Sequence, residues 1–134
     1  MAKQMPVVDY LVLDDGPPHL VARRCTKCNA QYFDRRNACA SCEGTDFKQV
    51  ALATTGKVRS FTIVHRAAPG VPTPYVSALI DLDSGDGTVK TNIVNTDPTP
   101  EKVTLGMPVR LATFVADTDS QGTEAVAFGF EPAA

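Results

Sequence analysis

The sequence has no long apolar run. No segment approaches the roughly 20 apolar residues that a helix needs to cross a membrane, so no membrane association is expected. The first ten residues, MAKQMPVVDY, also lack the basic and then apolar pattern of a secretory signal peptide. We therefore expect a cytoplasmic protein, in which thiols stay reduced and bind metal more readily than they form disulfides.

The sequence also carries little net charge. Its 134 residues include 13 Lys and Arg against 15 Asp and Glu, which gives a net charge of -2. Residues 51–134 hold 6 of the basic and 9 of the acidic side chains. This balance excludes a general electrostatic attraction to nucleic acid or to anionic membranes.

Cysteine is scarce, and its spacing is informative. The only cysteines form two C-x-x-C pairs, Cys25/Cys28 and Cys39/Cys42, with ten residues between the pairs. Structural zinc takes four soft ligands, and each C-x-x-C turn supplies two sulfurs from one tight loop. A catalytic zinc would keep an open position or use histidine, and only His19 lies nearby. The spacing predicts a rubredoxin-like zinc ribbon with structural zinc; iron and a redox dithiol are the alternatives.

The rest of the chain shows the alternation of short β-strands. The clearest strand spans 56–65 (GKVRSFTIVH), and its period of two predicts one face with Val58, Ser60, Thr62 and Val64 and another with Arg59, Phe61, Ile63 and His65. Further strands are expected at 19–24, 32–33, 75–81, 88–94, 108–116 and 123–130.

These strands predict an all-β protein in three parts. Residues 1–18 form an N-terminal arm that is not expected to fold alone, 19–50 the zinc ribbon, and 51–134 an OB-fold domain. Five strands, one longer connection at 95–106 and no strong helical pattern favour the five-stranded OB barrel. Its core candidates are Phe61, Phe114, Phe128 and Phe130.

Three stretches together resemble a known family. They are RCTKCNAQYFDRRNACASCEG at 24–44, GKVRSFTIVHRAAPGVPTPYVSALIDLDSG at 56–85 and LGMPVRL at 105–111. They resemble the zinc-ribbon plus OB-fold proteins of acyl-CoA metabolism, in particular the small partner subunits of thiolase-like (lipid-transfer-protein-like) steroid side-chain aldolases. The sequence departs from the family pattern at Asn29, at 34–38 and at Val71. Asn29 stands in place of glycine and can still adopt the left-handed conformation of the turn.

The resemblance implies a non-catalytic accessory subunit, required by a thiolase-like enzyme. That enzyme would cleave a β-hydroxyacyl-CoA by a retro-aldol reaction, as in steroid side-chain degradation. The OB barrel would dock on it and help form the acyl-CoA channel, with the coenzyme A thioester as a shared ligand. The resemblance also implies a hetero-oligomer of two plus two chains.

Two other functions stay open. The chain can instead belong to a thiolase, acyltransferase or hydratase complex, or bind single-stranded nucleic acid. Zinc ribbons and OB-folds both occur in nucleic-acid-binding proteins, but such a groove needs basic residues interleaved with exposed aromatics. The acidic barrel half therefore argues against nucleic acid as the partner.

Five residues are candidates for coenzyme A contacts. Arg35 and Arg36 lie at the predicted tip of the ribbon, where guanidinium groups suit phosphates; the alternative is a solvated tip that balances the thiolate charge. His65 and Arg66 end the clearest strand before a proline-rich loop, and Tyr75 opens the next strand. The alternative for His65 and Arg66 is that they belong to a simple connection between strands, and the alternative for Tyr75 is that it is a core residue. No catalytic residue is expected, because all four cysteines are assigned to metal and no nucleophile with an orienting acid is evident around His65.

Overall fold

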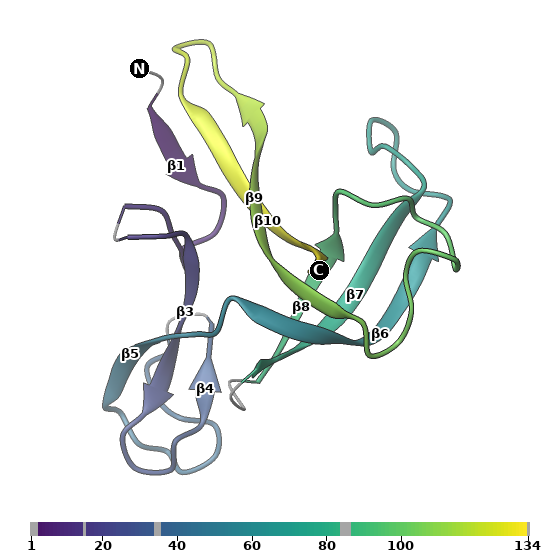
Figure 1. Ribbon diagram of the computed structural model, residues 1–134. Helices are drawn as coiled ribbons and strands as arrows, with labels where there is room; N and C mark the ends of the chain where they lie inside the picture. The colour runs from purple at the N-terminus through teal and green to yellow at the C-terminus, as the bar shows by residue number, and fades with distance from the viewer. Residues whose placement is uncertain (1–2, 15, 34–35, 84–86, 134) are drawn as a thin grey trace. The chain divides into compact units, whose positions relative to one another are not determined.

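The structure is a computed structural model that describes residues 3–14, 16–33, 36–83 and 87–133. This part of the chain contains strands β1 (Gln4–Pro6), β2 (Leu11–Val12), β3 (His19–Cys25), β4 (Gln31–Tyr32), β5 (Phe47–Ala51), β6 (Thr55–Val64), β7 (Tyr75–Leu82), β8 (Thr88–Ile93), β9 (Pro108–Thr118) and β10 (Glu124–Pro132) (Figure 1). No helix within it is long and apolar enough to span a membrane.

The chain forms two compact units. Unit 1 comprises Met1–Leu52 and Val115–Ala127, and unit 2 comprises Ala53–Phe114 and Phe128–Ala134. The hairpin of β9 and β10 therefore contributes its tip to unit 1 and its base to unit 2. The division into 1–18, 19–50 and 51–134 stays a prediction.

Unit 1 is organised around β3, which pairs antiparallel with β2, β4 and β5. In the β2–β3 pair, Leu11 lies opposite Leu20, and both side chains are buried. The amide of Val21 donates to the carbonyl of Tyr10 (2.9 Å), and β1 pairs in parallel with β10. The two strands of the arm thus obtain their partners from other parts of the chain.

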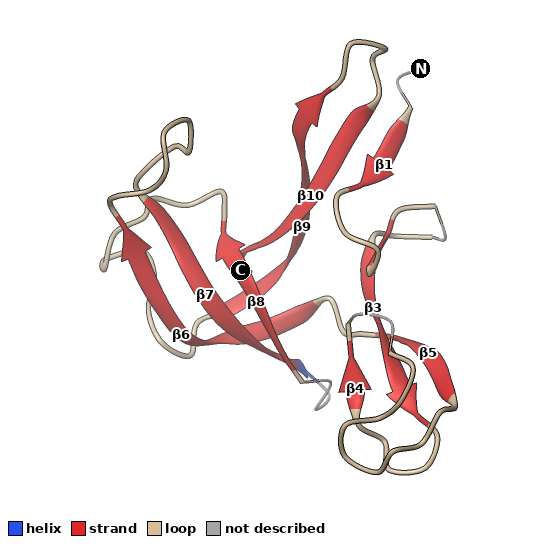
Figure 2. Ribbon diagram, turned by 180° about the vertical axis from the view of Figure 1, so that it is seen from behind, coloured by secondary structure: helices blue, strands red, loops and turns tan. Residues whose placement is uncertain are grey.

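Unit 2 is a closed five-stranded barrel. Strands β6, β7 and β8 pair antiparallel in sequence order and lie side by side in Figure 2. Strand β8 then pairs in parallel with β10, β10 with β9, and β9 with β6, which closes the ring β6-β7-β8-β10-β9. This Greek-key order is that of an OB-fold, so the predicted all-β class with an OB barrel is confirmed.

The barrel core follows strict alternation along β7. Its buried side chains face the buried side chains of β8 in register, and Leu79 between them is 37% exposed. Each fully buried Val or Ile contributes about 1.5–3 kcal/mol of hydrophobic stabilisation. The buried set on β7 and β8 is Val76, Ala78, Ile80, Leu82, Val89, Thr91 and Ile93.

The two faces predicted for the clearest strand are wrong beyond Val58. The pairing of β6 with β7 shifts register between Val58 and Ser60, a β-bulge at Arg59. One extra residue inverts the alternation. Phe61 therefore lies opposite the buried Ala78 and is half-buried, whereas Ser60 is exposed.

Phe114 is not a core residue, contrary to the prediction. It is 42% exposed, whereas Phe130 is fully buried and Phe61 and Phe128 are half-buried. The register of β9 with β6 covers Pro108–Arg110, so Phe114 lies beyond the part of β9 that β6 covers.

Gly56 should be intolerant of any side chain. It pairs with both Leu82 and Val109, and a Cβ there would lie 2.5 Å from the carbonyl oxygen of Asp81. Overpacking of this kind costs about 1–3 kcal/mol. We expect Gly56→Ala to lower the free energy of unfolding by about 2–3 kcal/mol in urea titrations. The exposed neighbour variant Lys57→Ala should change it by less than about 0.5 kcal/mol; equal stability of the two variants would refute this packing.

Candidate functional site

Four thiol groups converge at one end of unit 1. The sulfur atoms of Cys25, Cys28, Cys39 and Cys42 all lie within 4.8 Å of one another. Two contacts join the two pairs: Cys25 to Cys42 and Cys28 to Cys39, each 3.5 Å between sulfurs. Tetrahedral zinc with Zn–S bonds near 2.3 Å requires sulfurs about 3.8 Å apart, so these separations fit the ion.

The two C-x-x-C turns have the same backbone geometry. The amide of Asn29 donates to the carbonyl of Cys25 (3.0 Å), and the amide of Glu43 donates to that of Cys39 (2.9 Å). Asn29 has φ 65° and Glu43 φ 66°. The left-handed conformation expected of Asn29 is therefore confirmed. Its counterpart at Glu43 was not predicted, although Glu43 holds the same place after the second cysteine of its pair.

Gly44 lies close against the sulfur cluster. A Cβ there would lie 3.3 Å from the sulfurs of both Cys25 and Cys42. The amide of Cys39 also donates to the Gly44 carbonyl (2.7 Å). A glycine at this position lets the backbone approach the sulfur cluster closely.

Tyr32 supports the cluster from outside. Its hydroxyl accepts a hydrogen bond from the amide of Ala40 (3.1 Å) and lies 3.5 Å from the sulfur of Cys39. The hydroxyl proton is then available to that sulfur. Partners of this kind orient metal ligands, and their loss typically lowers metal affinity about 10–100-fold. The aromatic between the cysteine pairs was noted from the sequence, but this role was not.

Electrostatics explains why the cluster needs a cation. The hydrogen bond from Tyr32 lowers the pKa of Cys39 to about 6. The amide of Gly44 lowers the pKa of Cys42, but the hydrogen bond with Cys25 and burial raise it, to about 12. Four neighbouring thiols thus cannot all lose their protons alone, whereas a dication would hold all four as thiolates. The donor set and its spacing fit structural zinc, which would order the ribbon.

Of the two predicted arginines, Arg35 lies outside the described residues. Arg36 is exposed, and its guanidinium carbon lies 4.1 Å from the centre of the Tyr32 ring. This cation–π contact places a positive charge beside the hydroxyl that reaches Cys39. The geometry suits the charge-balancing alternative and leaves the outer side of the guanidinium open to solvent.

The other three predicted contacts gather at one end of the β6–β7 hairpin in unit 2. Tyr75 pairs with Val64, and His65 and Arg66 follow directly. His65 and Arg66 are exposed, and within the described part of the chain neither makes a hydrogen bond or an ion pair; Tyr75 is half-buried. The loop that follows is braced by a bond from the amide of Val71 to a backbone carbonyl at Ala68 (3.1 Å).

The zinc site predicts a graded response to substitution. Cys39→Ser should lose most of the bound zinc, because a hydroxyl is a poor ligand in a four-sulfur site. Tyr32→Phe keeps the ring beneath Arg36 but removes the hydroxyl beside Cys39, and should weaken zinc about 10–100-fold. Competition against a chromophoric chelator measures both. Tyr75→Phe is the matched control and should keep the zinc affinity of the wild type. If Tyr32→Phe binds zinc as tightly as Tyr75→Phe does, the Tyr32 hydroxyl does not support the site.

Three curated relatives are similar to this chain. A DUF35 domain-containing scaffold protein of Methanocaldococcus jannaschii is 33% identical over 84% of this chain and 81% of its own length. A probable enoyl-CoA hydratase alpha subunit of Thermomonospora curvata is 36% identical over 75% of this chain, and the benzoylsuccinyl-CoA thiolase subunit BbsA of Geobacter metallireducens is 38% identical over 52%. The chain spans about a third of the hydratase subunit (31%) and about half of BbsA (47%).

One solved structure matches nearly the whole fold. It is described as an Ltp2-ChsH2(DUF35) aldolase, and the match has a TM-score of 0.68 and 32% identity over 87% of this chain and 86% of that chain. Two family models also match: ChsH2, rubredoxin-like zinc ribbon domain, over residues 16–48, and ChsH2, C-terminal OB-fold domain, over residues 49–115. The chain belongs to the ChsH2 (DUF35) family of zinc-ribbon and OB-fold proteins.

Proposed function

We propose that this chain is a non-catalytic subunit that binds a thiolase-like enzyme acting on acyl-CoA. One observation carries the proposal: the match to the ChsH2 chain of the aldolase extends over 87% of this chain and 86% of that one. The similarity to that structure therefore covers both the zinc ribbon and the barrel, rather than the zinc ribbon alone. The scaffold protein and the thiolase subunit among the relatives support the same role.

The described residues support placing the chemistry on the partner. The one cluster of metal-ligating groups within them consists of the four thiols, and a structural zinc site with four sulfur ligands leaves no open position for a substrate or water. The His65 side chain is exposed and makes no hydrogen bond or ion pair in the described part of the chain that would orient it as a base. The exposed loop after His65, with Val71 46% exposed, offers contact area instead.

We further propose a specific reaction and assembly. The partner cleaves a β-hydroxyacyl-CoA by a retro-aldol reaction of the steroid side-chain type, and requires this chain for activity. The barrel docks on the enzyme and forms one wall of the acyl-CoA channel, in a hetero-oligomer of two plus two chains. The description of the matched structure as an aldolase supports this choice of reaction.

The coenzyme A contacts are assigned to Arg35, Arg36, His65, Arg66 and Tyr75. Arg66 is the strongest of these within the described residues, because its charge is exposed and has no ion-pair partner there. A guanidinium group can bind a phosphate through two parallel hydrogen bonds. Arg36 already contacts Tyr32, and this contact limits the directions in which it can reach a ligand.

A hydratase complex is the second candidate. The relative from Thermomonospora curvata, a probable enoyl-CoA hydratase alpha subunit, is 36% identical over 101 residues. The same ribbon and barrel can therefore serve a partner that adds water to an enoyl-CoA. The two candidates share acyl-CoA as the ligand and differ in the partner's reaction.

The proposal is tested by co-expressing this chain with the thiolase-like protein whose gene lies nearest to the gene of this chain. We expect the two chains to co-purify, and the complex to cleave a β-hydroxyacyl-CoA while neither chain alone does. Thiolysis of a β-ketoacyl-CoA and hydration of an enoyl-CoA are assayed in parallel to separate the alternatives. Turnover by this chain alone, or its persistence as a monomer beside the enzyme, would contradict the proposal.

Arg66→Ala tests the coenzyme A assignment in the assembled complex. Loss of one phosphate contact made equally in ground and transition states should raise KM for the acyl-CoA about tenfold and leave kcat nearly unchanged. Lys57→Ala removes an exposed cation from the same barrel and should leave both constants unchanged. An unaltered KM in Arg66→Ala would remove Arg66 from the contact set.

A further inference from the structure

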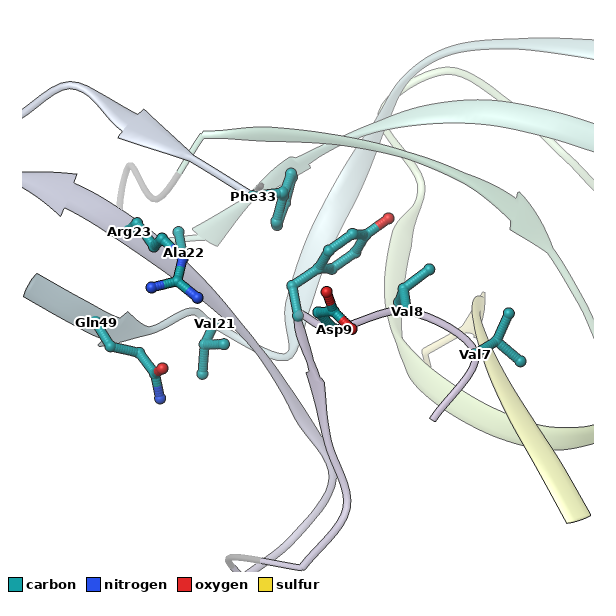
Figure 3. Close-up of a pocket in the computed structure, with 9 residues that line it drawn as sticks. Val7, Val8, Asp9, Val21, Ala22, Arg23, Phe33 and Gln49 are labelled. Atoms are coloured by element: carbon teal, nitrogen blue, oxygen red, sulfur yellow. The ribbon is translucent and has the colours of Figure 1, made fainter. Parts of the chain in front are cut away.

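Unit 1 contains a pocket that none of the roles above uses. The cavity has a volume of about 340 Å³ and lies between the N-terminal arm and the ribbon. Figure 3 shows Val7, Val8 and Asp9 of the arm on one side, and Val21, Ala22, Arg23, Phe33 and Gln49 of the ribbon on the other. Its volume is at the lower end of the range for ligand sites, about 300–1,000 Å³.

The walls of the pocket are held in place. Val21 and Ala22 are buried on β3, and the rings of Tyr10 and Phe33 pack with centroids 4.6 Å apart. The arm is fixed on both sides of the pocket by backbone bonds, from Val7 N–H to the Val126 carbonyl and from Val21 N–H to the Tyr10 carbonyl, each 2.9 Å. The site is therefore preformed, which reduces the entropy lost when it is occupied.

The pocket opens onto further exposed apolar surface. Val7 is 54% exposed, and Met5, two residues earlier in the arm, is 53% exposed. Val8 and Phe33 are half-buried. A small-molecule site would enclose most of its ligand, whereas an open apolar pocket with a polar rim is typical of the anchor sites of protein interfaces.

The rim carries charge that has no partner in the described part of the chain. Arg23 makes no ion pair or hydrogen bond there, whereas its neighbour Arg24 donates to Gln31 (2.9 Å). Arg23 lies in the central strand of the ribbon, opposite Gln49 on β5, and both are exposed. Asp9 is exposed on the opposite wall, so an occupant meets a cation on the ribbon side and a carboxylate on the arm side.

We propose that this pocket receives an apolar side chain of the thiolase-like partner, with an adjacent carboxylate of the same segment paired with Arg23. The inference rests on the proposed function and assigns one part of its interface. Charge complementarity selects the occupant, because the Arg23 guanidinium, which has no ion-pair partner among the described residues, matches a segment whose apolar anchor is followed by an acidic residue on the ribbon side, away from Asp9. Met5, which is exposed and does not line the pocket, extends the contact beyond it.

Two variants of the full chain test the pocket. Gln49→Trp blocks its mouth, and Arg23→Glu reverses the charge of its rim. Each should weaken binding to the thiolase-like partner at least tenfold, as measured by titration calorimetry. Lys48→Trp and Lys48→Glu are matched controls, since Lys48 is exposed on the same strand but points away from Gln49, and they should stay within twofold of the wild type.

The outcomes separate this inference from the proposed function. Zinc content and thermal unfolding of every variant show whether the ribbon is intact. If the wild type binds and all four variants bind equally well, the pocket proposal is wrong and the proposed function stands. If the wild type does not bind, the proposed function fails. Two other outcomes would overturn the proposal while partner binding stays intact. Loss of self-association in the pocket variants would assign the pocket to a second copy of this chain, and loss of acyl-CoA binding would assign it to a small ligand.

Discussion

The repulsion among four thiolates is the constraint on which the ribbon depends. Sulfurs within 4.8 Å of one another cannot all ionise without a cation between them, and from residue 26 to 46 the described buried residues are only Cys39 and Gly44. This segment has almost no apolar core, so metal–thiolate bonds replace hydrophobic burial as its source of order. Several features position the sulfur atoms: the Tyr32 hydroxyl, the close approach of Gly44, and the left-handed backbone of Asn29 and Glu43 after each cysteine pair.

The barrel is stabilised in a different way. Its order comes from buried aliphatic side chains in register on β7 and β8, and from strand closure through β10 and β9. The two parts of the chain also differ in charge: Arg23 of the ribbon has no ion-pair partner among the described residues, whereas the sequence from residue 51 to 134 is acidic.

Local sequence patterns predicted most of the strands. The features that they did not predict depend on pairing between strands that are distant in the sequence. The strands after residue 50 lie within two residues of their predicted ends, because alternation and turn residues are local signals. The bulge at Arg59 and the exposure of Phe114 depend on where β6 meets β7 and β9, which no local pattern records. The cysteine spacing identified the thiol cluster directly, whereas the Tyr32 bond and the arm–ribbon pocket join segments whose approach only the fold establishes.

In our proposal zinc orders the ribbon, and a second chain carries out the chemistry. Native mass spectrometry of the co-expressed assembly tests both parts in one measurement. We expect a species that contains this chain and the thiolase-like chain, with one zinc for each copy of this chain. A spectrum with this chain alone, or with a hetero-oligomer that carries no zinc, would contradict it.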